Sequence, residues 1–259
     1  MNSPTQYPLL LFAISLIALW LSARAGLSFR RRQGTLDEEM REDFGFILAA
    51  TLTLLGLIIG FSFSMATSRY DQRKNYEEAE ANAIGTEYVR ADLLPDADAV
   101  CVRELLRKYL NERILFYEVQ DGQELQQINV RTARLQTELW TALHAPAAAQ
   151  PTPVMALVVS GMNDVLNSQG YTQAGYWNQI PTAAWCLMAA IAVGCNLLVG
   201  YGSRSAKVGA KMLAILPLIV AVAFVLIADI DSPRHGIIRV RPQNLISLAE
   251  SMPSLNGIP

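Results

Sequence analysis

The sequence is poor in charged residues, cysteine and histidine. Only 17% of its 259 residues are charged, whereas a soluble globular domain carries about 25%. The 21 lysines and arginines are outnumbered by 23 aspartates and glutamates, so no cationic excess exists to bind nucleic acid. Three cysteines without a CxxC pair exclude a disulfide framework and a thiolate zinc site, and two histidines argue against a histidine-rich metal or acid–base centre. A membrane protein is the class that remains.

Enzyme motifs are missing as well. The chain contains no GxSxG, Walker loop, GxGxxG or HExxH sequence. We therefore expect no catalytic residue, no metal site and no cofactor, and an enzyme is the poorest interpretation.

Four long segments contain no charged residue at all. Because a helix needs about 20 apolar residues, and at least about 17, to cross the hydrocarbon layer, each of these segments predicts a transmembrane helix. The uncharged segments are 1–23, 44–68, 165–203 and 212–228. The corresponding spans are predicted near 8–27, 44–67, 182–201 and 210–228.

The first apolar segment has two interpretations, a cleaved secretory signal or a retained anchor. The sequence Ala23-Arg24-Ala25 resembles a cleavage site, but the basic cluster Arg30-Arg31-Arg32 follows the apolar run. Secretory signals carry their positive charge in front of it. The sequence therefore favours a retained anchor.

The rest of the chain indicates helices outside the membrane. Residues 68–180 show apolar stripes at helical spacing and almost no strand pattern, and the second span continues without a breaker to Pro95. We predict an all-α integral membrane protein with four transmembrane helices and a helical extramembrane domain between the second and third spans. Its parts are a first transmembrane hairpin (1–67), the helical domain (68–180), a second hairpin (181–229) and a tail (230–259). Within the helical domain, helices are expected at 69–94, 98–119, 124–143 (with a heptad-like apolar seam) and 153–167, a linker at 144–153 and a loop at 170–175.

Basic residues near the spans bear on orientation. Eight lie on the side of the two short loops and six on the opposite side. This count favours short loops in the cytoplasm by a small margin.

Three sequence stretches together resemble the bestrophin-like membrane-protein family, which occurs in bacteria and plants. They are LLGLIIGFSFSMA followed by RYDQR at 54–73, EANAIGT leading to RADLLP at 80–95, and DIDSP followed by GIIRV at 229–240. The resemblance covers about 48–116 and 177–248, more than half of the chain.

The resemblance implies more than the residues alone do. Bestrophins are pentameric anion channels with four spans per subunit and a helical domain after the second span, so the resemblance implies a homo-oligomer, with a pentamer as its expected form, in contact with the lipid bilayer and small inorganic ions. It also implies the inner (plasma) membrane of a bacterium. Calcium gating is not implied, because Asp229 and Asp231 are only two carboxylates. Bestrophins keep the helical domain in the cytoplasm, which opposes the charge count above.

The end of the second span supplies the pore candidates Ile59, Phe61, Ser62 and Phe63. They could form a hydrophobic constriction that gates by dewetting. The alternative is ordinary packing against lipid or other helices, which accounts for most phenylalanines in membranes.

Charged and polar residues near the spans form a second group of candidates. The residues that follow the second span could collect anions at a pore mouth, or act as interface charges with local partners. Those farther along suggest inter-helix hydrogen bonds or, less readily, a ligand site. Those after the fourth span are expected to pair with each other or with the arginines that follow the second span. The group comprises Arg69, Asp71, Arg73, Glu80, Asn82, Arg90, Asp92, Asp229, Asp231 and Arg234.

Two functions remain open. One is an ion channel, with anions as the expected cargo and the second span as the pore lining. The other is a non-conducting membrane scaffold or sensor whose helical domain binds a partner protein. The absence of charges inside the spans fits both and opposes an ion-coupled transporter, which needs ionisable groups there.

Overall fold

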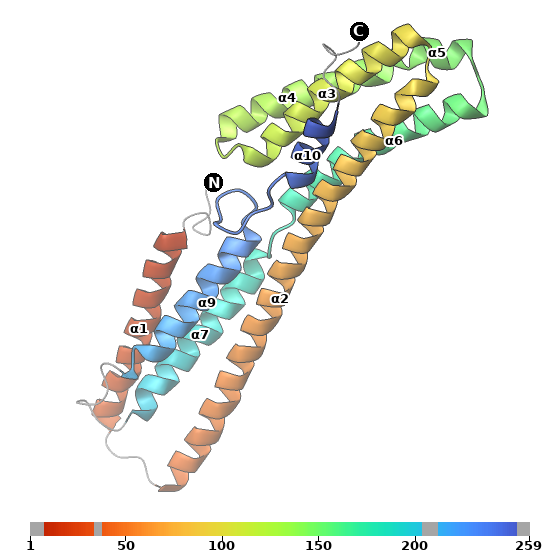
Figure 1. Ribbon diagram of the computed structural model, residues 1–259. Coiled ribbons are helices and arrows are strands. Elements are labelled where there is room, and N and C mark those ends of the chain that lie inside the picture. Colours follow the sequence, from red (N-terminus) through yellow and green to blue (C-terminus); the bar gives the residue numbers. More distant parts are fainter. Residues whose placement is uncertain (1–7, 34–37, 204–211, 253–259) are drawn as a thin grey trace. The chain divides into compact units, whose positions relative to one another are not determined.

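The protein consists of helices joined by short irregular segments, without a strand, in the part of the chain that its computed structural model describes, residues 8–33, 38–203 and 212–252 (Figure 1). This confirms the all-α prediction. The helices are α1 (Pro8–Gln33), α2 (Glu38–Arg90), the short 3-10 helix η2 (Ala91–Leu93), α3 (Asp96–Glu118), α4 (Gly122–Ala142), α5 (His144–Ala149), α6 (Pro153–Trp177), α7 (Thr182–Gly202), α9 (Ile215–Asp231) and α10 (Gln243–Ser251).

The chain forms two compact units, and the 53-residue helix α2 contributes to both. The membrane unit comprises Met1–Arg69 and Gln179–Arg239, and the helical unit comprises Tyr70–Asn178 and Val240–Pro259. The segment predicted as a tail, 230–259, is thus divided between the two units.

Length and composition identify the membrane spans. Among the described residues, three helical stretches, Leu9–Arg32, Met40–Leu93 and Pro153–Gly202, are long and apolar enough to cross a membrane, and the third includes α7. The fourth predicted span is α9, which has 17 residues and carries charge only at its end, in Asp229 and Asp231. That length meets the lower limit for a crossing. Residues 204–211, and with them the start of the predicted fourth span, lie outside the described residues.

In the membrane unit, α1, α7 and α9 lie side by side (Figure 1). The contact between α1 and α7 is close because each helix has a glycine, which lacks a side chain, where the two backbones meet. A Cβ on Gly26 of α1 would overlap the carbonyl of Leu197, and a Cβ on Gly200 of α7 would overlap the carbonyl of Ala23. Small residues let transmembrane helices approach to backbone contact, which is the main source of helix association in lipid.

The helix α2 contributes less to this packing. Only 6% of the most apolar stretch of α2 is buried within the chain. The corresponding share is 22% for Leu9–Arg32 and 28% for Pro153–Gly202. Leu55 is its buried residue in the apolar core of the membrane unit, and the Cys195 thiol of α7 donates to the Thr51 carbonyl at 3.3 Å. Most of the apolar surface of α2 is therefore left uncovered within one chain.

The helical unit has a core of its own, to which α2 contributes Ala81 and Ile84 and η2 contributes Ala91. The helices α3 and α4 pack on each other and α10 packs on α3. The predicted seam of α4 faces inward, with Ile128, Thr132 and Leu139 all buried.

Two expectations for the helical unit were wrong. Residues 144–149 of the expected linker form the short helix α5. The Thr152 hydroxyl caps α6 by accepting from the Met155 amide at 3.2 Å, as its sequence predicts, but α6 runs to Trp177 and includes the expected loop 170–175. There Gly175 lies against Tyr76 of α2, with 2.9 Å between its ideal Cβ position and the ring, so a tertiary contact stabilises helix where local preference favours a turn.

Candidate functional site

The membrane part of α2 exposes one apolar face. Leu57 and Phe61, one turn apart, are 52% and 64% exposed, and nothing lies within 4 Å of the Cβ positions of Gly56 and Gly60. The opposite face, with Leu55, is buried in the membrane unit. This long, uncovered surface is the main feature of the span.

The four pore candidates do not share this face. Phe61 and Phe63 are both exposed, but a two-residue step turns an α-helix by about 200°, so they point to different sides. Ile59 is half-buried and packs on the membrane-unit core. Ser62 is 5% exposed and lies on the side of α2 that is buried within the chain.

Arg69 follows the apolar run and is held by Asp231 at the end of α9. Its Nη1 lies 3.4 Å from Oδ1 of Asp231. The other carboxylate oxygen of Asp231 accepts from the Ile180 backbone amide at 2.9 Å. Asp231 therefore ties three segments of the membrane unit together, and the predicted pairing of the carboxylates with arginine is present here.

Asp229 has a different role. Its carboxylate accepts from the backbone amides of Ile237 and Ile238 at 2.7 and 2.8 Å. Between them and α9 lies Gly236, where a Cβ would overlap the Asp229 carbonyl. Asp229 thus closes the turn after the fourth span, and its two oxygens are used by the backbone.

Past the membrane unit, α2 carries charged residues on its buried face. The residues Arg73, Glu77, Glu80 and Glu87 are at most 2% exposed. Their spacings of four, three and seven place them on the face that also carries Ile84. Four buried charged side chains on one helix are unusual, because a buried charge is costly unless it is paired or neutralised.

Glu80 is the centre of a buried polar network. Its carboxylate accepts from both the Nε and the Nη2 of Arg113 on α3, the latter at 3.4 Å. The hydroxyls of Tyr117 and Thr172 donate to its Oε2 at 3.2 and 3.1 Å. Burial, followed by the Glu80 charge, raises the pKa of Tyr117, which keeps that hydroxyl protonated as a donor. The network joins α2, α3 and α6.

Glu77 binds the C-terminal segment. One of its oxygens accepts from the Asn244 side-chain amide at 2.6 Å, and the other accepts from the Leu245 backbone amide at 3.0 Å. Because Leu245 lies in the first turn of α10, the carboxylate also sits where a helix N-terminus favours negative charge.

Glu87 differs from both, because neither of its oxygens has a hydrogen-bond partner among the described residues. It is 0% exposed and lies against Gly161 of α6. Desolvation by burial raises the pKa of Glu87 to about 8, against the attraction of Arg90, with a smaller upward contribution from Asp164.

The other polar candidates lie on α2, on η2 and in the turn after α9. Asn82 is exposed within the chain, since a position two residues beyond Glu80 faces the other way. Asp71 is exposed, and Asp92 forms an ion pair with Arg103 of α3. Arg234 is half-buried in the turn after α9.

Arg113, Glu77 and Glu87 were not among the residues predicted from the sequence. For Arg113, a signal was present in α3. Arg113 occupies a position of the apolar stripe that includes Tyr109 and Phe116, all three of which are buried. A charged residue at a core position of an amphipathic helix predicts a buried partner.

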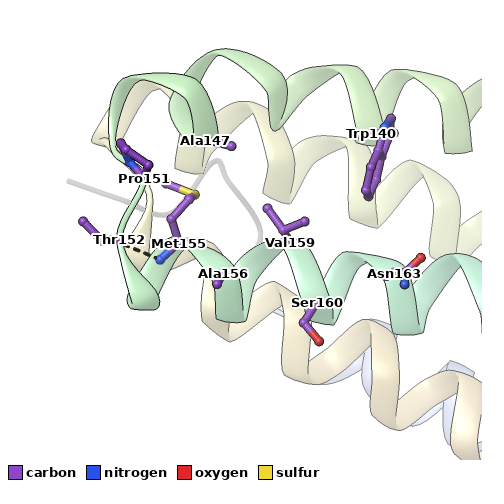
Figure 2. A pocket seen from close by; sticks show the side chains of 9 residues that line it. All are labelled: Trp140, Ala147, Pro151, Thr152, Met155, Ala156, Val159, Ser160 and Asn163. Atoms are coloured by element: carbon purple, nitrogen blue, oxygen red, sulfur yellow. Dashed lines mark hydrogen bonds between the residues drawn. The ribbon is translucent and has the colours of Figure 1, made fainter.

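An open groove of about 580 Å³ lies between α4, α5 and the start of α6. Figure 2 shows Trp140 on one side and Met155 and Val159 on the other. None of the described residues that line it is charged, and its polar side chains are those of Trp140, Thr152, Ser160 and Asn163. The lining residues are Trp140, Ala147, Pro151, Thr152, Met155, Ala156, Val159, Ser160 and Asn163.

Comparisons with known proteins agree with this architecture. Residues 10–245 match the model of the Bestrophin-like domain. A bacterial bestrophin homologue from Klebsiella pneumoniae, in a variant with one tryptophan replaced by alanine, has a similar structure, with TM-score 0.63 and 12% identity over 93% of this chain and 97% of that one. A variant of that homologue with one tyrosine replaced by alanine gives TM-score 0.62 and 12% identity over 92% and 98%. Curated protein sequences give no match.

Proposed function

Because the chain belongs to the bestrophin-like family, we propose that it is an oligomeric membrane channel that passes anions through a hydrophobic constriction lined by α2. The observation that carries this proposal is the uncovered apolar face of α2. Only 6% of the most apolar stretch of this helix is buried in one chain. In a ring of subunits, this face has a place either at the subunit contacts or along a central path. The proposed location is the inner membrane of a bacterium.

The constriction is best assigned to the side of α2 that carries Leu57, Phe61 and Met65. These residues follow each other at intervals of four and are 52%, 64% and 38% exposed. A ring of such side chains would exclude water from a narrow path, which is the basis of gating by dewetting. The preference for anions comes from the family. Arg69 alone supplies little support for it, because its charge is balanced by Asp231.

A recording of single-channel currents tests the proposal. The purified protein is reconstituted in planar bilayers under asymmetric chloride, and wild type is compared with Phe61→Ala and Phe63→Ala. We expect chloride-carried currents, with a severalfold change of conductance or open time in Phe61→Ala and a smaller change in Phe63→Ala, its matched control on the other side of the helix.

Silence at all voltages, with a correctly assembled oligomer in the same membrane, would contradict the channel. Equal effects of the two substitutions would contradict the assignment of the Phe61 side.

The groove beside Trp140 favours a second candidate, a membrane scaffold or sensor whose helical unit binds a partner protein. Trp140 is 38% exposed on an uncharged surface, and exposed aromatic residues are enriched at protein interfaces. An assembled oligomer that carries no current would favour this second function over the channel. Loss of a co-purifying partner protein in Trp140→Ala would then support it.

A further inference from the structure

Glu87 is a buried carboxyl group in a glycine notch between two helices. It projects from α2, and a Cβ on Gly161 of α6 would overlap both its carboxylate and the Arg90 guanidinium. Because glycine has no side chain, α6 leaves room for these two groups. The carboxyl and guanidinium groups therefore fill the space where the two helices meet.

The groups that face Glu87 do not neutralise it by a direct bond. Arg90 of α2 attracts its negative charge, and Asp164 of α6 repels it. Neither Glu87 oxygen has a hydrogen-bond partner among the described residues, unlike Glu77 and Glu80 on the same helix face. The other nearby carboxylate of this segment, Asp92, is paired with Arg103.

An ionised carboxylate without partners is costly in such a place, whereas a neutral carboxyl group is tolerated. The packed state therefore favours the protonated form of Glu87, and an open state, in which water reaches the group, favours the ionised form.

We propose that Glu87 is a proton-binding site that controls the contact between α2 and α6. With the proton bound, the neutral carboxyl group stays in the notch at Gly161 and the helices remain packed. When the proton passes to solvent, the carboxylate requires water, and the contact opens more often. This proposal concerns the helical unit and does not depend on conduction.

The direction of the pH effect follows from linkage. The pKa of Glu87 is about 8 in the packed state, against 4.5 for a solvated glutamate. The packed state therefore retains the proton over this interval while the open state loses it, and packing is strongest below the lower value and weakens up to about 8. The opening equilibrium should rise about tenfold per pH unit between pH 5 and 8 and level off above.

Hydrogen–deuterium exchange of the full-length protein in nanodiscs tests this. Peptides covering residues 155–168 of α6 are followed between pH 5 and 9, with rates corrected for the intrinsic pH dependence of exchange. In wild type, we expect the protection of these amides to fall about tenfold per pH unit between pH 5 and 8. In Glu87→Gln, which keeps a neutral side chain of the same shape, protection should stay constant within about twofold. The matched control is Glu78→Gln, which changes an exposed glutamate on the same helix and should behave as wild type.

Infrared spectroscopy gives a second readout that requires no opening. The carbonyl stretch of a protonated carboxyl group should be present in wild type at pH 7, and absent at pH 9.5 and in Glu87→Gln. The proposal is overturned if wild-type protection of α6 does not change between pH 5 and 8, if Glu87→Gln retains the wild-type pH dependence, if Glu78→Gln abolishes it, or if the infrared band is the same in wild type and Glu87→Gln.

Discussion

At the scale of single residues, the helical unit depends on how its buried charges are neutralised. The Glu80–Arg113 pair is 0% exposed on both sides and has two hydroxyl donors as additional partners. Such a pair adds little net stability compared with an apolar pair, but removing one partner leaves an uncompensated charge in the core.

This asymmetry predicts the result of a double-mutant cycle. Glu80→Gln and Arg113→Met should each lower the free energy of unfolding of the helical unit by about 3–5 kcal/mol. The double variant should be more stable than the sum of the two losses implies, because neither charge is then left alone. Chemical denaturation of the detergent-purified protein, followed by circular dichroism, measures all four proteins. Strictly additive losses would show that the two residues do not stabilise each other.

At the scale of elements, the contact between α1 and α7 is the most sensitive to added volume. Gly200 meets the Ala23 carbonyl so closely that no Cβ fits. Gly200→Ala should therefore force the helices apart and lower the stability of the membrane unit by about 1–3 kcal/mol.

The chain provides a matched control for this change. Gly194 lies on the same helix, is exposed and has nothing within 4 Å of its Cβ position. Gly194→Ala should be neutral or slightly stabilising, since alanine favours a helix more than glycine does. Thermal unfolding in detergent distinguishes the two variants, and equal melting temperatures would contradict the assigned role of Gly200.

Most of the elements could be predicted from the sequence, because charge gaps and apolar periodicity are local signals. The continuous second helix, the α3 and α4 helices and the Thr152 cap all follow from such signals. The last ten residues of α6 did not, because Gly170 and Gly175 favour a turn and only the contact with Tyr76 shows why the helix continues.

The candidate site was less predictable for the same reason. Glu80 was selected from α2, but its partners Arg113 and Thr172 come from α3 and α6, 33 and 92 residues away. Helical geometry alone separates Asn82 from Glu80, and Ser62 from the exposed phenylalanines. Which of the faces is buried depends on packing, and a single helix does not reveal that.

At the scale of the whole molecule, the uncovered face of α2 predicts assembly. Leu54, Leu57, Phe61 and Met65 are 38–64% exposed along one side of the span. In lipid this exposure is permitted, but a helix with so little packing in its own chain would gain van der Waals contacts from a second copy.

Native mass spectrometry of the detergent-purified protein measures this assembly. We expect a ring of identical subunits, with five copies by analogy with bestrophins, that persists on dilution. A monomer at all protein concentrations would contradict the proposed channel and leave the isolated subunit as the functional form.

The pairing of distant segments also determines how the protein can be made. The helix α1 leaves the ribosome well before its partner α7, which begins at Thr182, 149 residues after α1 ends at Gln33. At about 5–20 residues per second, translation of that interval takes roughly 7–30 s. During this time the surface of α1 around Gly26 has no α7 to pack against. The Glu77 carboxylate likewise has no α10 amide to bind. A nascent chain that stops before α7 therefore lacks packing in both units, because α1 then has no α7 and Glu77 has no α10.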